Sequence, residues 1–338
     1  MSERKMATIR RVDGIHPIEG ADAIECAFVD GWTVVVKKGE FKPGDLAVYC
    51  EIDSWVPTEI APFLTKGKEP REFNGVKGER LKTIRLRGQL SQGLLLPCYI
   101  LLDKIGEIYE GDDVSEVLGI QKWEAPIPAQ LAGQVRGNFP TMIPKTDQER
   151  VQNLIKEISA AAKAGLKFEV TEKLEGSSMT CYLINGEFGV CSRNLDLKRD
   201  ENNTFWAVAI AEQIEEKMRY AFSDRNVAIQ GELIGPGIQG NIYNLTRHEF
   251  RVFDIYGADA GVYWLPANRQ AIVAIMGLKH VPVLAQTLLF TDVQAILATA
   301  EGKSQLNPQQ EREGIVFKDV NGGMSFKAIS NKYLLKQD

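Results

Sequence analysis

The stretch Glu172-Lys173-Leu174-Glu175-Gly176-Ser177-Ser178 decides the interpretation of this chain. It completes and follows Lys167–Lys173, an alternating segment that predicts a β-strand. With 30 glycines in 338 residues, an isolated Lys-x-x-Gly arises by chance and means little alone. The evidence is the ordered set of segments that comes after it: Ser192-Arg193-Asn194, Gly231-Glu232-Leu233, Phe250–Asp254, Glu313-Gly314-Ile315-Val316 and Ser325-Phe326-Lys327.

The first 125 residues have the pattern of a series of short β-strands. The runs Ala27-Phe28-Val29 and Trp32–Val36 are rich in β-branched and aromatic residues and flank Asp30-Gly31, a dipeptide typical of tight hairpins. A further strand is predicted over Leu46–Cys50. Several short strands separated by glycine and proline predict a small closed barrel. The segment His16–Asp22 is similar to the opening of OB-type tRNA-binding domains.

The ordered motifs, taken together, resemble those of the covalent lysyl-nucleotidyltransferases, the superfamily of polynucleotide ligases and capping enzymes. Within it, the form Lys-Leu-Glu-Gly-Ser-Ser and the OB-like N-terminal part most resemble template-directed, nick-sealing RNA ligases whose OB domain precedes the catalytic domain. The resemblance implies ATP-dependent joining of 3′-hydroxyl and 5′-phosphate ends through ligase-(lysyl-N)-AMP and RNA-adenylate intermediates. The implied cofactors are ATP and Mg²⁺ or Mn²⁺, and the implied partner is RNA or an RNA-containing nicked duplex.

The implied fold is α+β, with an OB-type β-barrel followed by an antiparallel-sheet nucleotidyltransferase domain. We expect the barrel over residues 1–125, a proline-rich linker or strap over 126–147, and the adenylyltransferase domain over 148–338. Apolar spacing in the last part predicts helices over Gln148–Ala164 and Thr204–Ala221. Strands and helices do not alternate as regular βαβ units, which argues against a doubly wound sheet.

The resemblance also implies roles for individual residues. Lys173 has the position of the nucleophile that becomes linked to AMP, and Lys327 is expected to contact the α-phosphate and neutralise charge in the transition state. Phe253 is expected to stack on adenine, with Asp254 beside it. Arg193 is expected to bind phosphate, a task that suits its planar guanidinium. The set implied for nucleotide binding is Glu172, Leu174, Glu175, Arg193, Glu232, Phe253, Asp254, Glu313, Lys327 and Arg150, the last toward the triphosphate.

Physical chemistry is compatible with such a lysine nucleophile. A lysine attacks phosphorus only when neutral, and with a pKa of about 10.4 only roughly 0.1% is neutral at physiological pH. Lowering that pKa by about 3 requires roughly 4 kcal/mol, which desolvation or a nearby cation supplies. In the resembled family a divalent metal lies beside the lysine. Glu175, Glu232 and Glu313 are the expected metal residues, acting through water, since Mg²⁺ keeps several of its waters.

Two local patterns depart from this interpretation or compete with it. The last motif of the resembled family often reads Lys-x-Lys, whereas here Ser325 stands first; either Lys318 or Lys332 shares the charge of Lys327, or one lysine suffices. The segment Gly235–Gly240 matches the GxGxxG of dinucleotide-binding sites, but no helix pattern follows it. We interpret it as an irregular loop on the nucleic-acid path.

Residues 66–87 carry eight basic side chains against three acidic ones. Within an OB-type domain, such a stretch is a credible phosphate-binding surface that positions a strand without reading its sequence. The residues expected to contact nucleic acid are Lys77, Arg80, Lys82, Arg85, Arg87 and, beside the nucleophile, Ser178.

The composition is that of a soluble globular protein. The net charge of −5 argues mildly against nucleic-acid binding, but a site rich in glutamates and a local basic stretch make the two compatible. Five cysteines without a CxxC pair favour a reducing compartment. The N-terminus lacks a signal core, and no apolar run has the length of a membrane span. We therefore expect a cytoplasmic monomer with no membrane partner.

Three alternatives stay open on the sequence alone. A DNA ligase or a GTP-dependent capping-type nucleotidyltransferase shares the lysine chemistry, but those proteins usually place the OB domain after the catalytic domain. A non-catalytic OB-type RNA-binding protein with a decayed catalytic domain is the second, opposed by the presence of Lys173, Glu232, Glu313 and Lys327. A Rossmann oxidoreductase is the weakest alternative, because no helix pattern follows Gly240.

Overall fold

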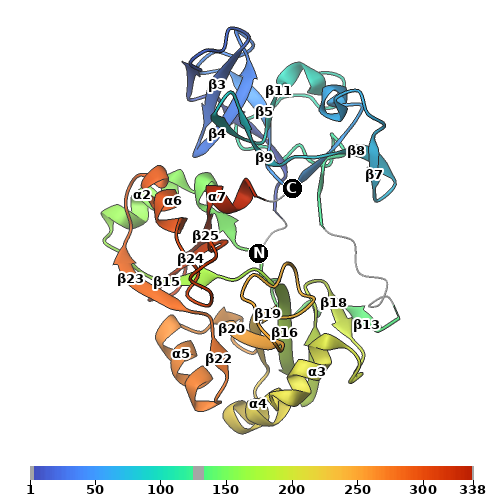
Figure 1. The fold of residues 1–338 in the computed structure, drawn as a ribbon, viewed down its shortest axis with the longest axis vertical. Coiled ribbons are helices and arrows are strands. Elements are labelled where there is room, and N and C mark those ends of the chain that lie inside the picture. The colour runs from blue at the N-terminus through green and yellow to red at the C-terminus, as the bar shows by residue number, and fades with distance from the viewer. Residues whose placement is uncertain (1–3, 125–132, 337–338) are drawn as a thin grey trace. The chain divides into compact units, whose positions relative to one another are not determined.

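The structure is a computed structural model that describes residues 4–124 and 133–336 (Figure 1). It divides into two compact units, which are described separately. Of the described residues, the N-terminal unit contains 4–124 together with Gln152–Ile155 and 334–336. The C-terminal unit contains residues 133–151 and 156–333. The chain therefore returns to its N-terminal unit twice after leaving it.

The N-terminal unit is built from short strands in four small sheets, with strand orders β1-β5-β11, β2-β3-β4, β10-β9 and β12-β6-β8-β7. The strands are β1 (Ala7–Arg11), β2 (Gly14–Pro17), β3 (Ile24–Val29), β4 (Trp32–Lys37), β5 (Leu46–Cys50), β6 (Ser54–Pro57), β7 (Arg71–Phe73), β8 (Val76–Arg80), β9 (Thr83–Leu86), β10 (Gln89–Gln92), β11 (Leu94–Pro97) and β12 (Gln121–Lys122). Two 3₁₀ turns, η1 (Pro62–Thr65) and η2 (Cys98–Leu101), interrupt them.

The predicted hairpin is present in this unit. Strands β3 and β4 pair antiparallel with Val29 opposite Trp32, and Asp30 adopts the positive φ of 49° that such a tight turn requires. Trp32 is fully buried, and its ring lies against that of Tyr49 from β5. Its indole Nε1 donates to Asn153 Oδ1 at 2.7 Å, within the returned segment. Aromatic packing and one buried hydrogen bond thus fix the hairpin.

The C-terminal unit contains two larger sheets. The first has the order β13-β18-β17-β16-β19-β20-β21, with β22 pairing parallel to β20. Its strands are β13 (Val135–Asn138), β16 (Ser177–Ile184), β17 (Glu187–Cys191), β18 (Leu195–Leu197), β19 (Val227–Ile234), β20 (Glu249–Gly257), β21 (Val262–Tyr263) and β22 (Lys279–His280). Helices α3 (Thr204–Ala211), α4 (Ile214–Phe222) and α5 (Pro266–Ile275) contribute to its apolar core.

The second sheet of this unit has the order β14-β25-β24-β15-β23. Its strands are β14 (Glu149–Arg150), β15 (Lys167–Lys173), β23 (Val283–Leu288), β24 (Gly314–Asp319) and β25 (Ser325–Ile329), followed by α7 (Asn331–Leu334). Helices α2 (Ile155–Lys163) and α6 (Val293–Ala300) and the 3₁₀ turn η3 (Val151–Asn153) complete the C-terminal half of the chain.

Alternation along β15 gives this second sheet two different faces. Phe168 points to the apolar side, where its ring lies 5.8 Å from that of Phe326, which in turn stacks on Phe317. The intervening residues point to the other side, and Lys173 is the last of them. The polar face therefore carries the candidate nucleophile, while the apolar face anchors the strand.

The α+β fold class is confirmed, while two predicted helix boundaries are wrong. Glu149 and Arg150 pair with β25 instead of starting a helix, so α2 begins only at Ile155. The single helix predicted over Thr204–Ala221 is broken, because Gln213 adopts φ 54° between α3 and α4. Tertiary pairing and a local left-handed residue override the apolar spacing in both cases.

The segment predicted as a linker or strap over 126–147 contributes β13 to the first large sheet, antiparallel to β18. Its prolines Pro126 and Pro128 lie outside the described residues. The boundaries at residues 125 and 148 stay predictions.

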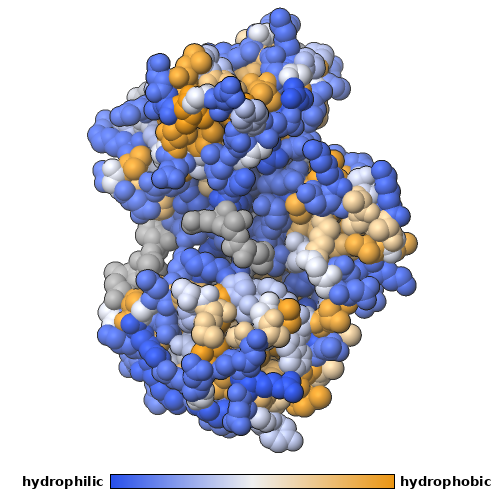
Figure 2. Space-filling view, turned by 180° about the vertical axis from the view of Figure 1, so that it is seen from behind, coloured by the Kyte–Doolittle hydropathy of each residue, from blue (hydrophilic) through white to orange (hydrophobic). Residues whose placement is uncertain are grey.

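The face seen in Figure 2 is mostly hydrophilic and carries several separate apolar patches. Within the described part of the chain, no helix is both long and apolar enough to cross a membrane.

Candidate functional site

The candidate nucleophile lies on a turn that joins the two sheets of the C-terminal unit. β15 ends at Lys173 in one sheet, and β16 begins at Ser177 in the other. Leu174 is buried and anchors the turn in an apolar cluster. Gly176 is required by close approach, because a Cβ there would meet the Leu233 carbonyl oxygen at 2.5 Å. The motif is thus the turn between the two sheets, and side chains from both sheets meet beside Lys173.

Lys173 lies among carboxylates. Its Nζ donates to Glu313 Oε1 at 2.6 Å, and both side chains are largely buried, at 28% and 15% exposed. Glu313 immediately precedes β24, whose Gly314 pairs with Lys173. Burial alone would lower the pKa of Lys173, but Glu313 and Glu232 together raise it above its ordinary value. Without nucleotide and metal, these carboxylates stabilise the ammonium form.

The other two predicted metal residues flank the same lysine. Burial raises the pKa of Glu232 to about 8, and Lys173 acts in the opposite direction. Burial and the repulsion of Glu313 raise the pKa of Glu175. Crowded, desolvated carboxylates of this kind gain stability from a divalent cation, so their chemistry fits Mg²⁺ or Mn²⁺. Among the described residues, no three His, Cys, Asp or Glu side chains are grouped closely enough to bind a metal directly.

Phe253 lies on β20 in a half-buried position, and a charged network holds it. Lys318 Nζ donates to the Phe253 carbonyl oxygen at 2.7 Å and lies 5.5 Å from the centre of its ring. The same Nζ lies 2.5 Å from Asp254 Oδ1, and burial lowers the pKa of Lys318 to about 8. Asp254 is also 3.6 Å from the fully buried Arg269 of α5. Asp254 therefore supports the Phe253 strand from inside the unit.

Lys327 and Lys318 lie on one face of the second sheet but have different surroundings. Lys327 is opposite Val316, and Lys318 is opposite Ser325, in the antiparallel register of β24 and β25. Ser325 Oγ donates to Gln148 Oε1 at 2.6 Å. Because Lys318 binds Asp254, it is engaged elsewhere and is not a simple substitute for the missing first lysine of the last motif.

The remaining predicted residues are distributed around this centre. Arg193 pairs with Asp147 at 2.6 Å. Its positive charge lies close enough to Lys173 and Glu232 to oppose the rise in the pKa of each. Ser178 Oγ lies 2.8 Å from Thr146 Oγ1.

Two of the residues expected to bind nucleotide are placed differently from the rest. Arg150 is buried on β14, beside β25 and opposite Lys327 in parallel register. Glu172 accepts from the Gln305 N–H at 2.8 Å and, by strand alternation, points to the face opposite Lys173. Its carboxylate is therefore not brought to the site, and only its backbone lies beside the nucleophile.

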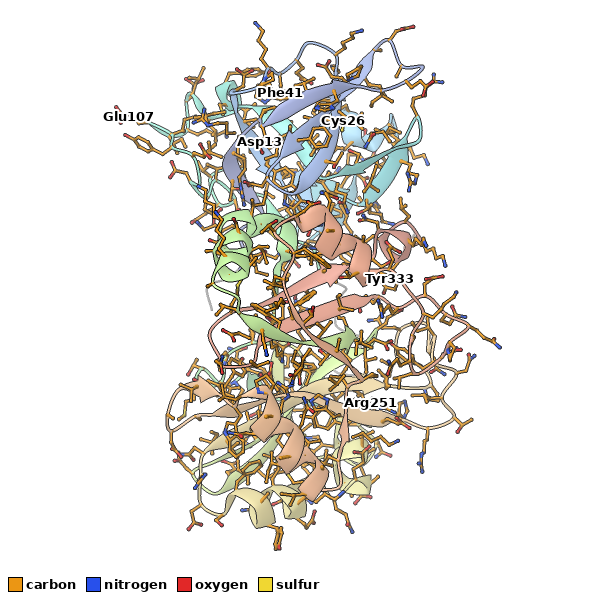
Figure 3. All side chains as sticks on the ribbon, turned by 90° about the vertical axis from the view of Figure 1, so that its left-hand side faces the viewer. Asp13, Cys26, Phe41, Glu107, Arg251 and Tyr333 are labelled. Atoms are coloured by element: carbon orange, nitrogen blue, oxygen red, sulfur yellow. The ribbon has the colours of Figure 1, made fainter. Side chains whose placement is uncertain are left out.

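Sequence reasoning missed two tyrosines at this site. Tyr243 Oη accepts from the Glu175 N–H at 2.6 Å. Tyr333 of α7, labelled in Figure 3, hydrogen-bonds the Glu175 carboxylate through its hydroxyl. Tyr243 lies just beyond the GxGxxG match, which was the one signal in the sequence that pointed to this segment.

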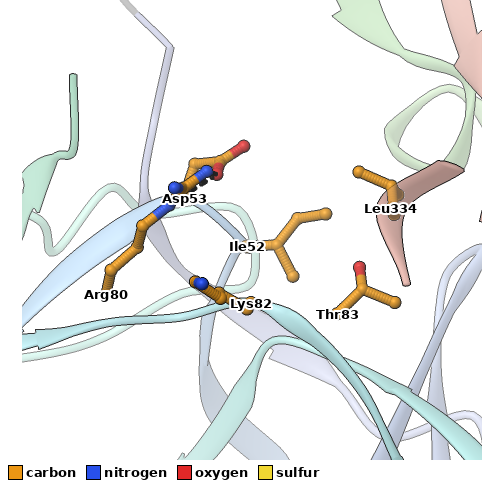
Figure 4. A pocket seen from close by; sticks show the side chains of 6 residues that line it. All are labelled: Ile52, Asp53, Arg80, Lys82, Thr83 and Leu334. Atoms are coloured by element: carbon orange, nitrogen blue, oxygen red, sulfur yellow. Dashed lines mark hydrogen bonds and ion pairs between the residues drawn. The ribbon is translucent and has the colours of Figure 1, made fainter. Parts of the chain in front are cut away.

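The basic residues predicted to contact nucleic acid fall into two groups in the N-terminal unit. Lys77 pairs with Glu69, and Arg80 pairs with Asp53 at 2.6 Å, as Figure 4 shows for the latter pair. A small pocket beside that pair is lined by Ile52, Asp53, Arg80, Lys82, Thr83 and Leu334.

The second group is Lys82, Arg85 and Arg87, which form no ion pair among the described residues. Arg85 and Arg87 lie on the exposed β9–β10 hairpin, whose Ile84 and Leu86 are about two-fifths exposed, at 41% and 39%.

Comparison with known proteins agrees with this geometry. A family model described as an OB-fold domain matches residues 6–98, and a model described as RNA ligase matches residues 166–333. The chain is 48% identical to Naegleria gruberi RNA ligase, which has been solved as a lysine-to-alanine variant with ATP and manganese. That match covers 98% of each chain with a TM-score of 0.91.

Other solved forms of the same Naegleria gruberi enzyme match equally well. A complex with AMP and manganese has a TM-score of 0.92, and a complex with pyrophosphate has 0.91, each covering 98% of both chains. A comparison with curated protein sequences gave no match.

Proposed function

The chain belongs to the RNA ligase family and is an ATP-dependent RNA ligase, and from that premise we propose that it seals nicks in duplexes with an RNA 3′-hydroxyl strand. The preference for nicks rests on the resemblance of the motifs, and the observation that carries the chemistry is the position of Lys173. Its amine lies 2.6 Å from Glu313 on the turn between two sheets, with Glu232 and Arg193 close enough to influence its pKa. The Naegleria gruberi enzyme has been solved with ATP, AMP and pyrophosphate, the substrate and products of such a lysine reaction.

The proposed reaction has three steps. The neutral Lys173 amine attacks the α-phosphorus of ATP, a P–N bond forms, and pyrophosphate leaves. The terminal 5′-phosphate of RNA then attacks the same phosphorus, so that AMP passes to the RNA and the lysine is released. Finally the 3′-hydroxyl attacks the activated 5′-phosphate, a phosphodiester forms, and AMP leaves.

The residues around Lys173 have distinct tasks in this scheme. Glu313 accepts a hydrogen bond from the ammonium and is the nearest group to receive its proton. Glu175, Glu232 and Glu313 hold the water shell of a divalent cation, which when bound polarises the phosphate and offsets the carboxylate charge. Lys327 neutralises charge on the α-phosphate.

The remaining nucleotide contacts come from the surrounding strands. Phe253 stacks on the base. Arg193 and Arg150 bind phosphate groups of the nucleotide and of the 5′-phosphate strand. Leu174 and the backbone of Glu172 support the nucleophile.

The N-terminal unit is proposed to bind the RNA duplex. Lys82, Arg85 and Arg87 are the proposed phosphate contacts, because acidic neighbours do not neutralise them. Lys77 and Arg80 are weaker candidates, since Glu69 and Asp53 already pair with them. Ser178, beside the nucleophile, is proposed to face the strand being joined.

The state of the protein in the cell is also proposed. All five cysteines are free, and burial raises the pKa of the Cys50 thiol to about 12 and that of Cys26 to about 11. Unreactive, unpaired thiols fit a reducing compartment such as the cytoplasm. We propose a monomer, with the OB-type part over residues 1–125 and the catalytic part over 148–338.

Adenylylation tests the first step directly. Purified protein, freed of bound AMP with pyrophosphate, is incubated with α-labelled ATP and Mg²⁺ or Mn²⁺, and label on the protein is measured. We expect an acid-labile adduct that is lost in Lys173→Ala and kept in Lys167→Ala, an exposed lysine on the same strand. An adduct on Lys173→Ala, or none on the wild type, would contradict the mechanism. Parallel reactions with GTP and NAD test the choice of nucleotide.

Sealing assays test the substrate. Nicked duplexes are compared with single strands, and each nick carries either an RNA or a DNA 3′-hydroxyl strand. We expect sealing of nicks with an RNA 3′-hydroxyl and little joining of single strands. Equal activity with a DNA 3′-hydroxyl strand would favour a DNA ligase.

A further inference from the structure

The loop over residues 235–244 has an unusual backbone. It follows β19 and contains the glycine pattern that resembles a dinucleotide fingerprint. Three residues other than glycine adopt positive φ, namely Gln239 at 47°, Asn241 at 43° and Asn244 at 52°. Such residues cost free energy and persist only where surrounding contacts fix them. The conformation of this loop is therefore held in place for a structural or functional reason.

The loop is bonded to the nucleophile turn. Tyr243 Oη accepts from the Glu175 N–H at 2.6 Å, and Gln239 Nε2 donates to the Gly176 carbonyl oxygen at 3.3 Å. The Gly240 N–H donates to the Glu175 carboxylate. A Cβ added at Gly240 would lie 3.9 Å from Glu175 Oε1, so the loop passes close to that carboxylate. These contacts reach both the backbone and the side chain two residues after Lys173.

The loop itself is rigidly anchored. Tyr243 is 4% exposed and packs in the apolar cluster that also contains Leu174. Asn307 Nδ2 donates to the Ile242 carbonyl oxygen at 2.7 Å, and Asn241 Nδ2 donates to the Leu245 carbonyl oxygen at 3.1 Å. The tyrosine hydroxyl therefore has a fixed position from which to hold the turn.

A second tyrosine holds the opposite side of Glu175. Tyr333 of α7 hydrogen-bonds the Glu175 carboxylate, which the Gly240 N–H also contacts. The carboxylate thus has two donors from segments far apart in sequence, one before β20 and one after β25. Both contacts oppose the burial that raises the pKa of Glu175, and so favour the carboxylate form.

We propose that the 235–244 loop is a cradle for the nucleophile turn, in which Tyr243 and Tyr333 are positioning residues that act through Glu175. Tyr243 fixes the backbone after Lys173 and so the direction of its amine, while Tyr333 fixes the Glu175 carboxylate. The proposal rests on the proposed function only for its kinetic consequence. Misplacement by a fraction of an ångström slows attack far more than it weakens nucleotide binding, because most contacts to the base and phosphates come from residues outside this turn.

The test compares Tyr243→Phe with a matched control. Tyr182→Phe removes the hydroxyl of another buried tyrosine in the same unit, whose Oη bonds Asp196 at 2.9 Å away from the turn. We expect Tyr243→Phe to slow lysyl-AMP formation about tenfold, the factor that loss of one buried hydrogen bond commonly costs. The Kd for ATP, measured by calorimetry in a Lys173→Ala background, should stay within about twofold. A rate equal to that of Tyr182→Phe, or a loss of ATP affinity that explains the slower rate, would overturn the proposal.

Amide exchange gives a readout that does not depend on catalysis. The Glu175 N–H should exchange about tenfold faster in Tyr243→Phe than in the wild type and should be unchanged in Tyr182→Phe. Tyr333→Phe should slow adenylylation while leaving the exchange of the Glu175 N–H unchanged. This variant tests the proposal if Tyr243→Phe folds poorly. Unchanged exchange in a folded Tyr243→Phe, or a normal rate in Tyr333→Phe, would refute the cradle. Failure of wild-type adenylylation would instead refute the proposed function.

Discussion

Neutralising the free basic side chains of the β9–β10 hairpin should change how RNA binding depends on salt. The perturbation is the triple variant Lys82→Gln, Arg85→Gln and Arg87→Asn. Asparagine suits position 87, because Arg87 adopts φ 49° and asparagine tolerates the left-handed region better than arginine. Asparagine at position 87 therefore keeps the turn geometry. Arg85→Gln removes a hydrogen bond of 2.8 Å from Arg85 Nη1 to the Gly88 carbonyl oxygen, so folding of the variant is checked by circular dichroism.

The magnitude follows from the number of unpaired cations. Each phosphate that a cation neutralises contributes about 0.9 to the slope of log affinity against log salt on a duplex, and about 0.7 on a single strand. Three contacts predict a slope shallower by roughly 2 to 3, with affinity at 0.1 M salt weaker by about two orders of magnitude. Arg71→Gln is the matched control, since Arg71 is exposed but already paired with Glu79.

The assay is fluorescence anisotropy with a nicked RNA duplex over a series of salt concentrations, with adenylylation measured in parallel. We expect the triple variant to lose binding and sealing while it keeps lysyl-AMP formation, and Arg71→Gln to leave the slope nearly unchanged. An unchanged slope in the triple variant would refute the assignment of this hairpin to phosphate binding. The same shift in Arg71→Gln would show that pairing within the protein does not decide which cations bind RNA.

Three further predictions concern stability. Arg269→Gln should cost about 3 to 5 kcal/mol in urea denaturation, because Arg269 and Glu169 form an ion pair with both side chains fully buried and the variant strands the carboxylate; a loss under 1 kcal/mol would contradict this. Burial and Arg269 lower the pKa of His280 to about 4. The His280 side chain therefore stays neutral in the folded protein down to that pH, whereas in the unfolded chain it takes up a proton below about pH 6.5. Stability should be full above about pH 6.5 and fall as pH drops toward 4, and urea titrations of His280→Gln should show a flatter decline than wild type. Asn153→Ala should cost about 1 to 3 kcal/mol by leaving the buried Trp32 indole N–H without its acceptor, and an unchanged midpoint of urea unfolding would argue against it.

The order of short motifs predicted which segments the fold would bring together. Lys173 ends β15, Glu232 lies on β19 and Glu313 immediately precedes β24, and each lies beside glycine or apolar strand residues. In the structure Lys173 donates to Glu313, and Glu232 lies close enough to raise the pKa of Lys173, while the catalytic roles of the three residues stay predictions. The sequence pattern also gave β15 with correct ends and placed the hairpin turn between Val29 and Trp32, although β3 begins at Ile24, three residues before the predicted run.

Other features depend on contacts that sequence order does not contain. The partner of Arg80 is Asp53, which lies outside the basic stretch, so a count of charges over residues 66–87 overestimated the free positive charge. Glu172 belongs to the nucleophile motif, but strand geometry turns its side chain away from Lys173. The roles of Tyr243 and Tyr333 arise from loop and helix positions that no periodicity specifies.

The return of Gln152–Ile155 to the N-terminal unit has a consequence for how the protein is made. Asn153 from this segment bonds both Trp32, at 2.7 Å, and Glu51, at 3.1 Å. During translation, all strands of the N-terminal unit are synthesised before Asn153, so the Trp32 indole N–H gains its acceptor only after those strands have been made. Leu334, which packs against the same core, arrives later still. The first domain to be synthesised is therefore among the last parts of the molecule to be finished.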